Sequence, residues 1–342
     1  MTAPGGGALS PVQRAIVMAA AYSDLFDYPL TRDELRRYLT VPCPGDRPFE
    51  AELEALVPER LQRQGELFML PGRGAIVELR RRRQRDDQAR WRHAGRYAGW
   101  LRHVPFVRMV AVCGSQAAGN PRPDADVDFF LITATGRLWL AQICAMLLRR
   151  FASWLSVPVC PNYFLTLGSL EVAPRDLYHA REVAQAVPLW GGDAYRRFRA
   201  ANGWVDELLP NLAHADDRSS RLAEPPRSRA AAGCEWLLGG VAGDLLERAV
   251  RALLLRYYAF RLRHLGWGRE QLRRAYRADR QEVMRGGYGP VVERAFRQRA
   301  REQLPEAVVD EELRRLFPDP AARAAPDRLF ARQFIERYGH GE

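Results

Sequence analysis

The first eighty residues carry the hydrophobic pattern of short helices followed by a hairpin. Residues 12–20 are apolar at every third or fourth position, which predicts a helix. Thr31 and Glu34 form a capping box that predicts the start of a second helix. Pro48 suits the first position of a third helix, because its missing N–H would have no partner there. Three consecutive helices are therefore expected before residue 65.

Two short apolar runs at 67–70 and 75–79 lie on either side of a link rich in Pro and Gly, and they predict a hairpin. Three helices followed by a hairpin is the order of a winged helix, so we expect a winged-helix-like domain over residues 10–80. Winged helices commonly bind DNA, but phosphates repel acidic side chains. The predicted third helix carries four such residues, which are Glu50, Glu52, Glu54 and Glu59. The pattern favours a structural or protein-docking role over DNA recognition.

The middle of the chain alternates between strand and helix patterns. Residues 80–104 predict one amphipathic helix, and residues 106–133 predict a strand, a turn, a short helix, a loop and a second strand. A helix over 136–155 and a strand over 157–167 then complete an α/β unit. We expect a central α/β domain with a small mixed sheet over residues 81–172.

Beyond residue 172 the pattern is helical. Helices are predicted over 176–187, 194–208 and most of 235–342, and a linker rich in Pro, Ser and Arg is predicted near 212–230. Residues 173–342 therefore predict a C-terminal helical domain. The fold class expected for the whole chain is α+β.

The composition is strongly basic, with a formal net charge of +11. Clustered cations bind nucleic acids by releasing counterions from the phosphates. All 52 basic residues are Arg, however, which is a compositional bias that weakens the charge as a sign of nucleic-acid binding. The run Arg80–Arg83 is either a solvated helix start or the lining of a groove for a polyanion. In residues 256–263, aromatic residues alternate with Arg, as on an RNA-binding surface or as an apolar helix stripe with solvated flanks.

The cysteines and the apolar runs predict a cytoplasmic protein without a membrane partner. The five cysteines are widely spaced and include no C-x-x-C pair, so neither a zinc site nor a disulfide framework is indicated. The longest apolar run, at residues 138–148, is far shorter than the roughly 20 residues that a bilayer requires. The N-terminus lacks the pattern of a signal peptide.

The passage from residue 110 to residue 131 carries the candidate chemistry. An apolar strand leads into Gly114 and Ser115 at a helix start, where backbone N–H groups and a hydroxyl can hold phosphate oxygens. Asp126 and Asp128 alternate with an apolar residue in a second strand, so both carboxylates lie on one face, about 6.6 Å apart along the chain. Oxygen ligands favour Mg²⁺ or Mn²⁺, and two such ions can stabilise an in-line phosphoryl displacement.

These residues resemble the signature of the DNA polymerase beta type nucleotidyltransferase superfamily. That signature is an apolar strand, the pair G-S, a spacer, and D-x-D in a second strand. The resemblance is to the minimal and antibiotic-modifying branches, it covers about residues 105–170, and its matching residues are Gly114, Ser115, Ala118, Gly119, Asp124, Asp126 and Asp128. It implies that Asp126 and Asp128 bind the metal ions and take part in catalysis, and that Gly114 and Ser115 contact the phosphates of an NTP.

A third carboxylate usually lies on a later strand in that superfamily, where it is a metal ligand or a base. Asn162 occupies this place here and is the third predicted ligand of the nucleotide and metal site. An amide oxygen can coordinate a metal, but an amide cannot accept a proton at neutral pH. Glu171, Asp176 and Glu182 follow closely enough to supply the base. We select Glu182 as the catalytic residue, because it faces inward on its predicted helix.

The sequence therefore predicts a Mg²⁺-dependent or Mn²⁺-dependent enzyme that transfers an NMP from an NTP, with ATP among the candidates, to a hydroxyl acceptor. The acceptor is RNA, a protein or a small molecule, and pyrophosphate is released. A second hypothesis is a nucleotide-binding regulator or toxin–antitoxin component with little or no activity, in which the winged helix is an interaction module. A third is duplex DNA binding by the winged helix, which the acidic third helix disfavours.

Overall fold

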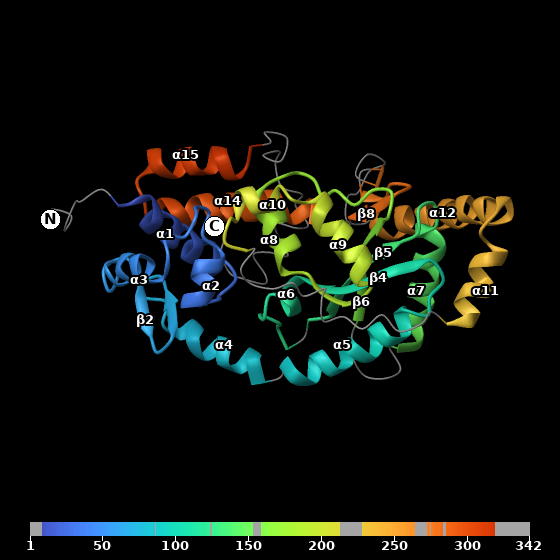
Figure 1. Ribbon diagram of the computed structural model, residues 1–342, viewed down its shortest axis with the longest axis horizontal. Coiled ribbons are helices and arrows are strands. Elements are labelled where there is room, and N and C mark those ends of the chain that lie inside the picture. The colour runs from blue at the N-terminus through green and yellow to red at the C-terminus, as the bar shows by residue number, and fades with distance from the viewer. Residues whose placement is uncertain are drawn as a thin grey trace.

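The computed structural model describes residues 9–85, 87–123, 125–152, 159–212, 228–263, 272–273, 275–282 and 285–318. Within these ranges the chain has the expected α+β composition, with helices around one three-stranded and one five-stranded sheet (Figure 1). None of the helices described there combines the length and the apolar character needed to cross a bilayer.

The N-terminal region contains three helices and a small antiparallel sheet. Its elements are α1 (Pro11–Asp24), β1 (Leu30–Thr31), α2 (Arg32–Arg37), α3 (Asp46–Glu54), β2 (Gln62–Gln64) and β3 (Leu67–Met69). The capping box of Thr31 and Glu34 is present and starts α2, as the sequence predicts. Strand β3 lies between β1 and β2, and both pairings are antiparallel. Pro48 is the third residue of α3 rather than the first.

The hairpin was only half predicted, because the second predicted strand is wrong. Residues 75–79 begin helix α4 (Ala75–Arg85), and β3 pairs instead with the preceding strand β2. The buried residues Ile76, Val77, Arg80 and Arg83 follow a helical period. Two of these four positions are arginines, so the apolar pattern alone does not reveal the period. Strand β2 carries only polar residues and gives no apolar signal.

Helix α4 is followed by α5 (Asp87–Leu101), so residues 80–104 form parts of two helices rather than one. Together α4 and α5 run along one side of the molecule, from the N-terminal region to the central sheet (Figure 1). In the run Arg80–Arg83, Arg80 and Arg83 are buried while Arg81 and Arg82 are exposed. The prediction of a fully solvated helix start is therefore wrong for half of the run.

The central sheet has the strand order β7-β4-β5-β6-β8 and is mixed, as expected. Its strands are β4 (Val107–Cys113), β5 (Val127–Thr133), β6 (Val159–Thr166), β7 (Val187–Trp190) and β8 (Arg280–Glu282). Only the pair β5 and β6 is parallel. The edge strands β7 and β8 were not predicted, because one is four residues long with a central proline and the other is polar.

Helices surround this sheet and make up most of the C-terminal part. They are α6 (Gly114–Ala117), α7 (Leu138–Ala152), α8 (Leu177–Gln185), α9 (Gly192–Ala201), α10 (Val205–Leu208), α11 (Arg229–Leu237), α12 (Val241–Leu262), α14 (Arg285–Arg301) and α15 (Glu306–Leu316). The predicted helix over 194–208 is two helices, because the buried Asn202 bonds to Leu170 and Val172 where α9 ends. Residues 213–227 of the predicted linker lie outside the described residues.

The two faces of the central sheet have different partners. One face shares a hydrophobic core with the N-terminal region and with α8, α9, α14 and α15. The other face packs against α5, α7 and α12. Helix α14, near the end of the chain, lies against α1, near its start (Figure 1). The N-terminal region is therefore continuous with the core of the central sheet.

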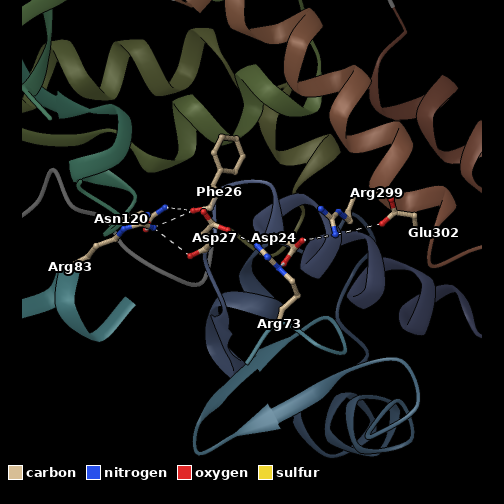
Figure 2. Close-up of polar contacts among 8 residues, drawn as sticks. All are labelled: Asp24, Phe26, Asp27, Arg73, Arg83, Asn120, Arg299 and Glu302. Carbon is tan, nitrogen blue, oxygen red and sulfur yellow. Dashed lines mark hydrogen bonds and ion pairs between the residues drawn. The ribbon is translucent and has the colours of Figure 1, made fainter. Parts of the chain in front are cut away.

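A network of buried and half-buried charged and polar side chains, which we call the polar joint, links these parts. It consists of Asp24, Asp27, Arg73, Arg83, Asn120 and Arg299 (Figure 2). Asp24 is 2% exposed and binds the guanidinium of Arg73 at 2.7 Å and that of Arg299 at 3.2 Å. Asn120, in the loop after α6, donates to the carbonyl of Phe26 at 2.8 Å and accepts from Arg83. The polar joint thus ties the end of α1 to α4, to α14 and to the α6 loop.

Candidate functional site

Strand β4 ends at Cys113, and the chain turns at Gly114 into the short helix α6. The φ angle of Gly114 is +66°, a value that strongly favours glycine. A Cβ atom at this position would lie 2.9 Å from a carboxylate oxygen of Asp128. The glycine therefore allows the turn and the carboxylate of the next strand to lie in contact.

Asp128 is the second residue of β5 and Asp126 directly precedes the strand, and both residues are half-buried. Asp128 is in register with Cys113 on β4 and with Cys160 on β6. Asn162 on β6 donates a hydrogen bond to Asp128 at 3.3 Å. The strand pairing thus places Asn162 beside the carboxylate, where the sequence predicts a third ligand. Asp124, the remaining acid of the motif, lies outside the described residues.

The thiol of Cys160 reports the electrostatics of this strand end. Burial, together with the negative charges of Asp128 and Asp126, raises its pKa to about 12, although Arg149 acts in the opposite direction. Cys160 is therefore protonated at neutral pH and is unsuited to be a nucleophile or a thiolate ligand. Both aspartates lie close enough to one buried group for their charges to act on it together.

A cavity of about 630 Å³ opens at this end of the sheet. Its volume lies in the range of small-molecule sites. All six site residues predicted from the sequence line it: Gly114, Ser115, Asp126, Asp128, Asn162 and Glu182. Residues from two strands, a turn and a later helix are thus brought to one space.

The three candidates for the base have different positions. Asp176 is 2% exposed and caps α8 by accepting from the backbone N–H of His179, and Glu171 pairs with Arg175 at the surface. Only Glu182, on α8, lines the cavity. The structure therefore leaves Glu182 as the one of the three that can reach a bound molecule.

The N-terminal region supplies a wall of the cavity, which the sequence did not predict. The lining residues from α1, from β1 and from the segments that follow α1 and α2 are Tyr22, Ser23, Phe26, Tyr28, Leu30 and Tyr38. Four further tyrosines come from the C-terminal half: Tyr178, Tyr258, Tyr276 and Tyr288. The rings of Tyr258 and Tyr276 stack at 4.4 Å. No local signal could reveal this wall, because its residues meet the aspartates only through tertiary packing.

Part of the segment 256–263 packs against the core, as expected for an apolar helix stripe with solvated flanks. Leu254 is buried, and Tyr258 and Leu262 pack beside it, which agrees with the predicted apolar stripe. Tyr257 is 41% exposed and departs from that stripe. Within α12 the sequence thus identified the packing face correctly except for one ring.

Among the residues that the structure describes, three arginines line the cavity: Arg122, Arg149 and Arg181. The run Arg80–Arg83 does not contribute to this lining, so the hypothesis that it lines a polyanion groove finds no support here. Arg80 instead binds Glu34 at 2.7 Å, and Arg83 belongs to the polar joint. The arginines that lie beside the predicted site therefore do not belong to the run of four.

The donor set near Asp128 suits a hard cation that keeps other ligands. No cluster of three or more His, Cys, Asp or Glu side chains that could hold a metal occurs in the part of the chain that the structure describes. Asp126, Asp128 and the amide oxygen of Asn162 nevertheless offer oxygen ligands. Mg²⁺ is commonly bound by one or two carboxylates together with substrate phosphates and water. The residues fit a metal that arrives with a phosphorylated substrate rather than a fully protein-bound ion.

Comparisons of the chain with protein-family models, with curated proteins and with solved structures found no match. The site is therefore interpreted from its own residues and geometry.

Proposed function

We propose that this protein is a Mg²⁺-dependent nucleotidyltransferase that transfers an NMP from an NTP to a hydroxyl group. One observation carries the proposal: a single cavity is lined by the Gly114–Ser115 turn, by Asp126 and Asp128, and by Glu182. A phosphate-holding turn, two metal-binding carboxylates and a base are the components that this reaction needs. These residues lie between the end of β4 and α8 in the sequence, and the fold brings them together.

The turn and the aspartates have distinct roles in the proposed reaction. The backbone N–H groups at Gly114 and the hydroxyl of Ser115 bind phosphate oxygens of the NTP. Asp126 and Asp128 would hold Mg²⁺, which when bound supplies Lewis-acid stabilisation of the charge on the phosphates. Asn162 orients Asp128 through their hydrogen bond. These residues hold the α-phosphate in line with the acceptor.

Glu182 is the proposed general base. It accepts the proton of the acceptor hydroxyl as the oxygen forms its bond to the α-phosphorus. The bond from that phosphorus to the oxygen bridging to the β-phosphate breaks, and pyrophosphate leaves with the bonding electrons. The products are the nucleotidylated acceptor and pyrophosphate.

We also propose that the N-terminal region is a winged helix with a structural role. Its element order and the sheet order β1-β3-β2 support that assignment. The acidic residues of α3 pair with neighbouring arginines: Glu50 with Arg32 at 2.7 Å and Glu54 with Arg63 at 2.8 Å. These pairs engage Arg32 and Arg63, two cations that DNA phosphates would otherwise attract. Residues of α1 and of the segments on either side of α2 line the cavity instead.

A second candidate function is nucleotide binding without turnover. The observation that favours it is Asn162, an amide at the place where a third carboxylate is expected. This alternative predicts that the NTP is bound but never cleaved, and that the regulator acts through its N-terminal region.

The decisive experiment incubates the full chain with each α-labelled NTP and Mg²⁺, and measures pyrophosphate release and label transfer. The variant Asp126→Ala/Asp128→Ala is expected to lose roughly a hundredfold or more of the rate, since a metal supplies several kcal/mol of transition-state stabilisation. Asp193→Ala is the matched control, because Asp193 is an exposed carboxylate outside the cavity. Its rate should equal that of the wild type.

Three results separate the candidates. Mg²⁺-dependent turnover that disappears only in the double variant supports the enzyme. NTP binding that needs Mg²⁺ and both aspartates, without any cleavage, supports the regulator. Binding that is equal in wild type and double variant and independent of Mg²⁺ overturns both assignments of the aspartates.

A further inference from the structure

Arg181 on α8 has an unusual environment for a buried cation. Its side chain is 4% exposed, and its guanidinium lies over the ring of Tyr22 at 4.1 Å and over that of Tyr38 at 4.2 Å. It donates one hydrogen bond, to the hydroxyl of Ser23 at 3.2 Å, and its Nε has no acceptor among the residues that the structure describes. Both rings and the hydroxyl belong to the N-terminal region.

Among the residues that the structure describes, Arg181 has no carboxylate as an ion-pair partner. Burial lowers the pKa of its guanidinium, and only the hydroxyl groups of Tyr22 and Tyr38 act against that effect. A buried charge without an opposite charge is costly. Arg80, which is buried to a similar extent, avoids this cost by pairing with Glu34. An anion that enters the cavity can supply the missing charge, because Arg181 lines it.

The cavity has two electrostatic neighbourhoods. The charges of Asp128, Arg149 and Asp126 act on the Cys160 thiol. Those of Arg181, Glu182 and Asp176, by contrast, act on the Tyr22 hydroxyl. The first neighbourhood is the end where the nucleotide and its metal are proposed to bind. The second contains the proposed base, so it is the end where the acceptor belongs.

We propose that Arg181 binds an anionic group of the acceptor, a phosphate or a carboxylate, and thereby places the acceptor hydroxyl beside Glu182. This inference rests on the proposed nucleotidyltransferase function. The planar fork of the guanidinium matches both anions. The tyrosine rings hold the fork in place, so an acceptor that lacks an anionic group leaves a buried charge unpaired.

The test is calorimetric titration of the full chain with inorganic phosphate, and separately with acetate, after the nucleotide end has been saturated with Mg²⁺ and a non-hydrolysable ATP analogue. Arg181→Gln is expected to weaken the binding of at least one anion by roughly tenfold to a hundredfold, the range for a hydrogen bond to a charged group. Arg82→Gln is the control, because Arg82 is exposed and is not among the residues that line the cavity. It should leave this anion binding unchanged.

The arms of the experiment have distinct meanings. Phosphate binding alone assigns a phosphorylated acceptor, and acetate binding alone assigns a carboxylate. Unchanged anion binding in Arg181→Gln overturns the inference. Loss of analogue binding in that variant to the same extent also overturns it, because Arg181 would then hold the nucleotide. If the wild type binds no analogue but binds phosphate through Arg181, the anion site stands and the proposed function fails.

A second measurement avoids dependence on the folding of the variant. The wild-type chain is treated with phenylglyoxal, with and without phosphate, and modified arginines are mapped by mass spectrometry. Phosphate should slow the modification of Arg181 severalfold and leave the exposed Arg82 unaffected. Equal rates at Arg181 with and without phosphate overturn the inference.

Discussion

The polar joint and the cavity are two buried polar regions of the same molecule, and both contain arginine. In the polar joint the chain supplies both signs of charge: Asp24 lies between Arg73 and Arg299 (Figure 2). In the cavity, Arg181 is more deeply buried than Arg73 or Arg299, but its neighbours are two rings and a hydroxyl. In the first arrangement a carboxylate balances the charge of its arginines, whereas among the described residues Arg181 has no carboxylate ion-pair partner.

This difference teaches how to separate structural from functional charges in an arginine-rich chain. Net charge and runs of arginine do not separate them, since the run Arg80–Arg83 belongs to the scaffold. What separates structural from functional arginines is whether the fold itself supplies a carboxylate partner. Substitutions in the polar joint should therefore change stability, whereas substitutions in the cavity should change binding and reactivity.

The largest effect is expected for Asp24→Asn. Removing this charge leaves two arginines without their common partner, which should lower the free energy of unfolding by roughly 3–5 kcal/mol. Urea denaturation followed by circular dichroism measures this change. Asp33→Asn is the control, because the Asp33 side chain is 88% exposed and should contribute within about 0.5 kcal/mol. Equal free energies of unfolding for the two variants would show that the charge of Asp24 in the polar joint stabilises the fold no more than a surface charge does.

A smaller effect is expected at Glu34, whose carboxylate binds Arg80 at 2.7 Å and accepts from Tyr28 at 2.8 Å. Burial opposes its ionisation, but the hydrogen bond and charge of Arg80 hold the pKa of Glu34 below its usual value of 4.5. Because the folded-state pKa is depressed, this stabilisation is present above pH 4.5 and is lost as the pH falls through the folded value.

The variant Glu34→Gln tests this pH dependence. The wild type should exceed the variant in free energy of unfolding at pH 7, and the difference should shrink as the pH falls below 4.5. Denaturation at a series of pH values measures the difference in free energy of unfolding. The control is Glu78→Gln, because Glu78 forms an exposed ion pair with Arg82 on α4. A gap that is constant or grows in acid contradicts the assignment of Glu34 to a charge pair.

The smallest effect is expected for Asp128→Asn on the pKa of the Cys160 thiol in the cavity. Burial comes first among the causes that raise its pKa to about 12, and the charge of Asp128 comes second. Asp128→Asn should therefore lower this pKa and speed the alkylation of Cys160 by iodoacetamide at pH 9, because more thiolate is present. Mass spectrometry of the Cys160 peptide measures the rate, and the exposed Cys234 serves as the internal reference. An unchanged rate contradicts the proximity of the two groups.

Several local features were predictable because short stretches of sequence encode them. The capping box at Thr31 follows from two residues. The turn at Gly114 and the acids at the start of β5 follow from one passage whose apolar alternation marks its strands. The first half of helix α4 and strands β2, β7 and β8 were missed, because their residues are polar, few, or buried by partners that lie elsewhere in the chain.

The sequence by itself determined the α+β composition, most helices, the turn at Gly114 and Ser115 after one strand, and the placing of Asp126, Asp128 and Asn162 at or beside two neighbouring strands. The tertiary structure decided which later residue joins them, because the placement of α8 separates Glu182 from Glu171 and Asp176. It also decided that the N-terminal region closes the cavity and that Arg181 lies there without a carboxylate partner among the described residues. Burial and charge pairing depend on contacts between distant segments, so no local pattern could encode them.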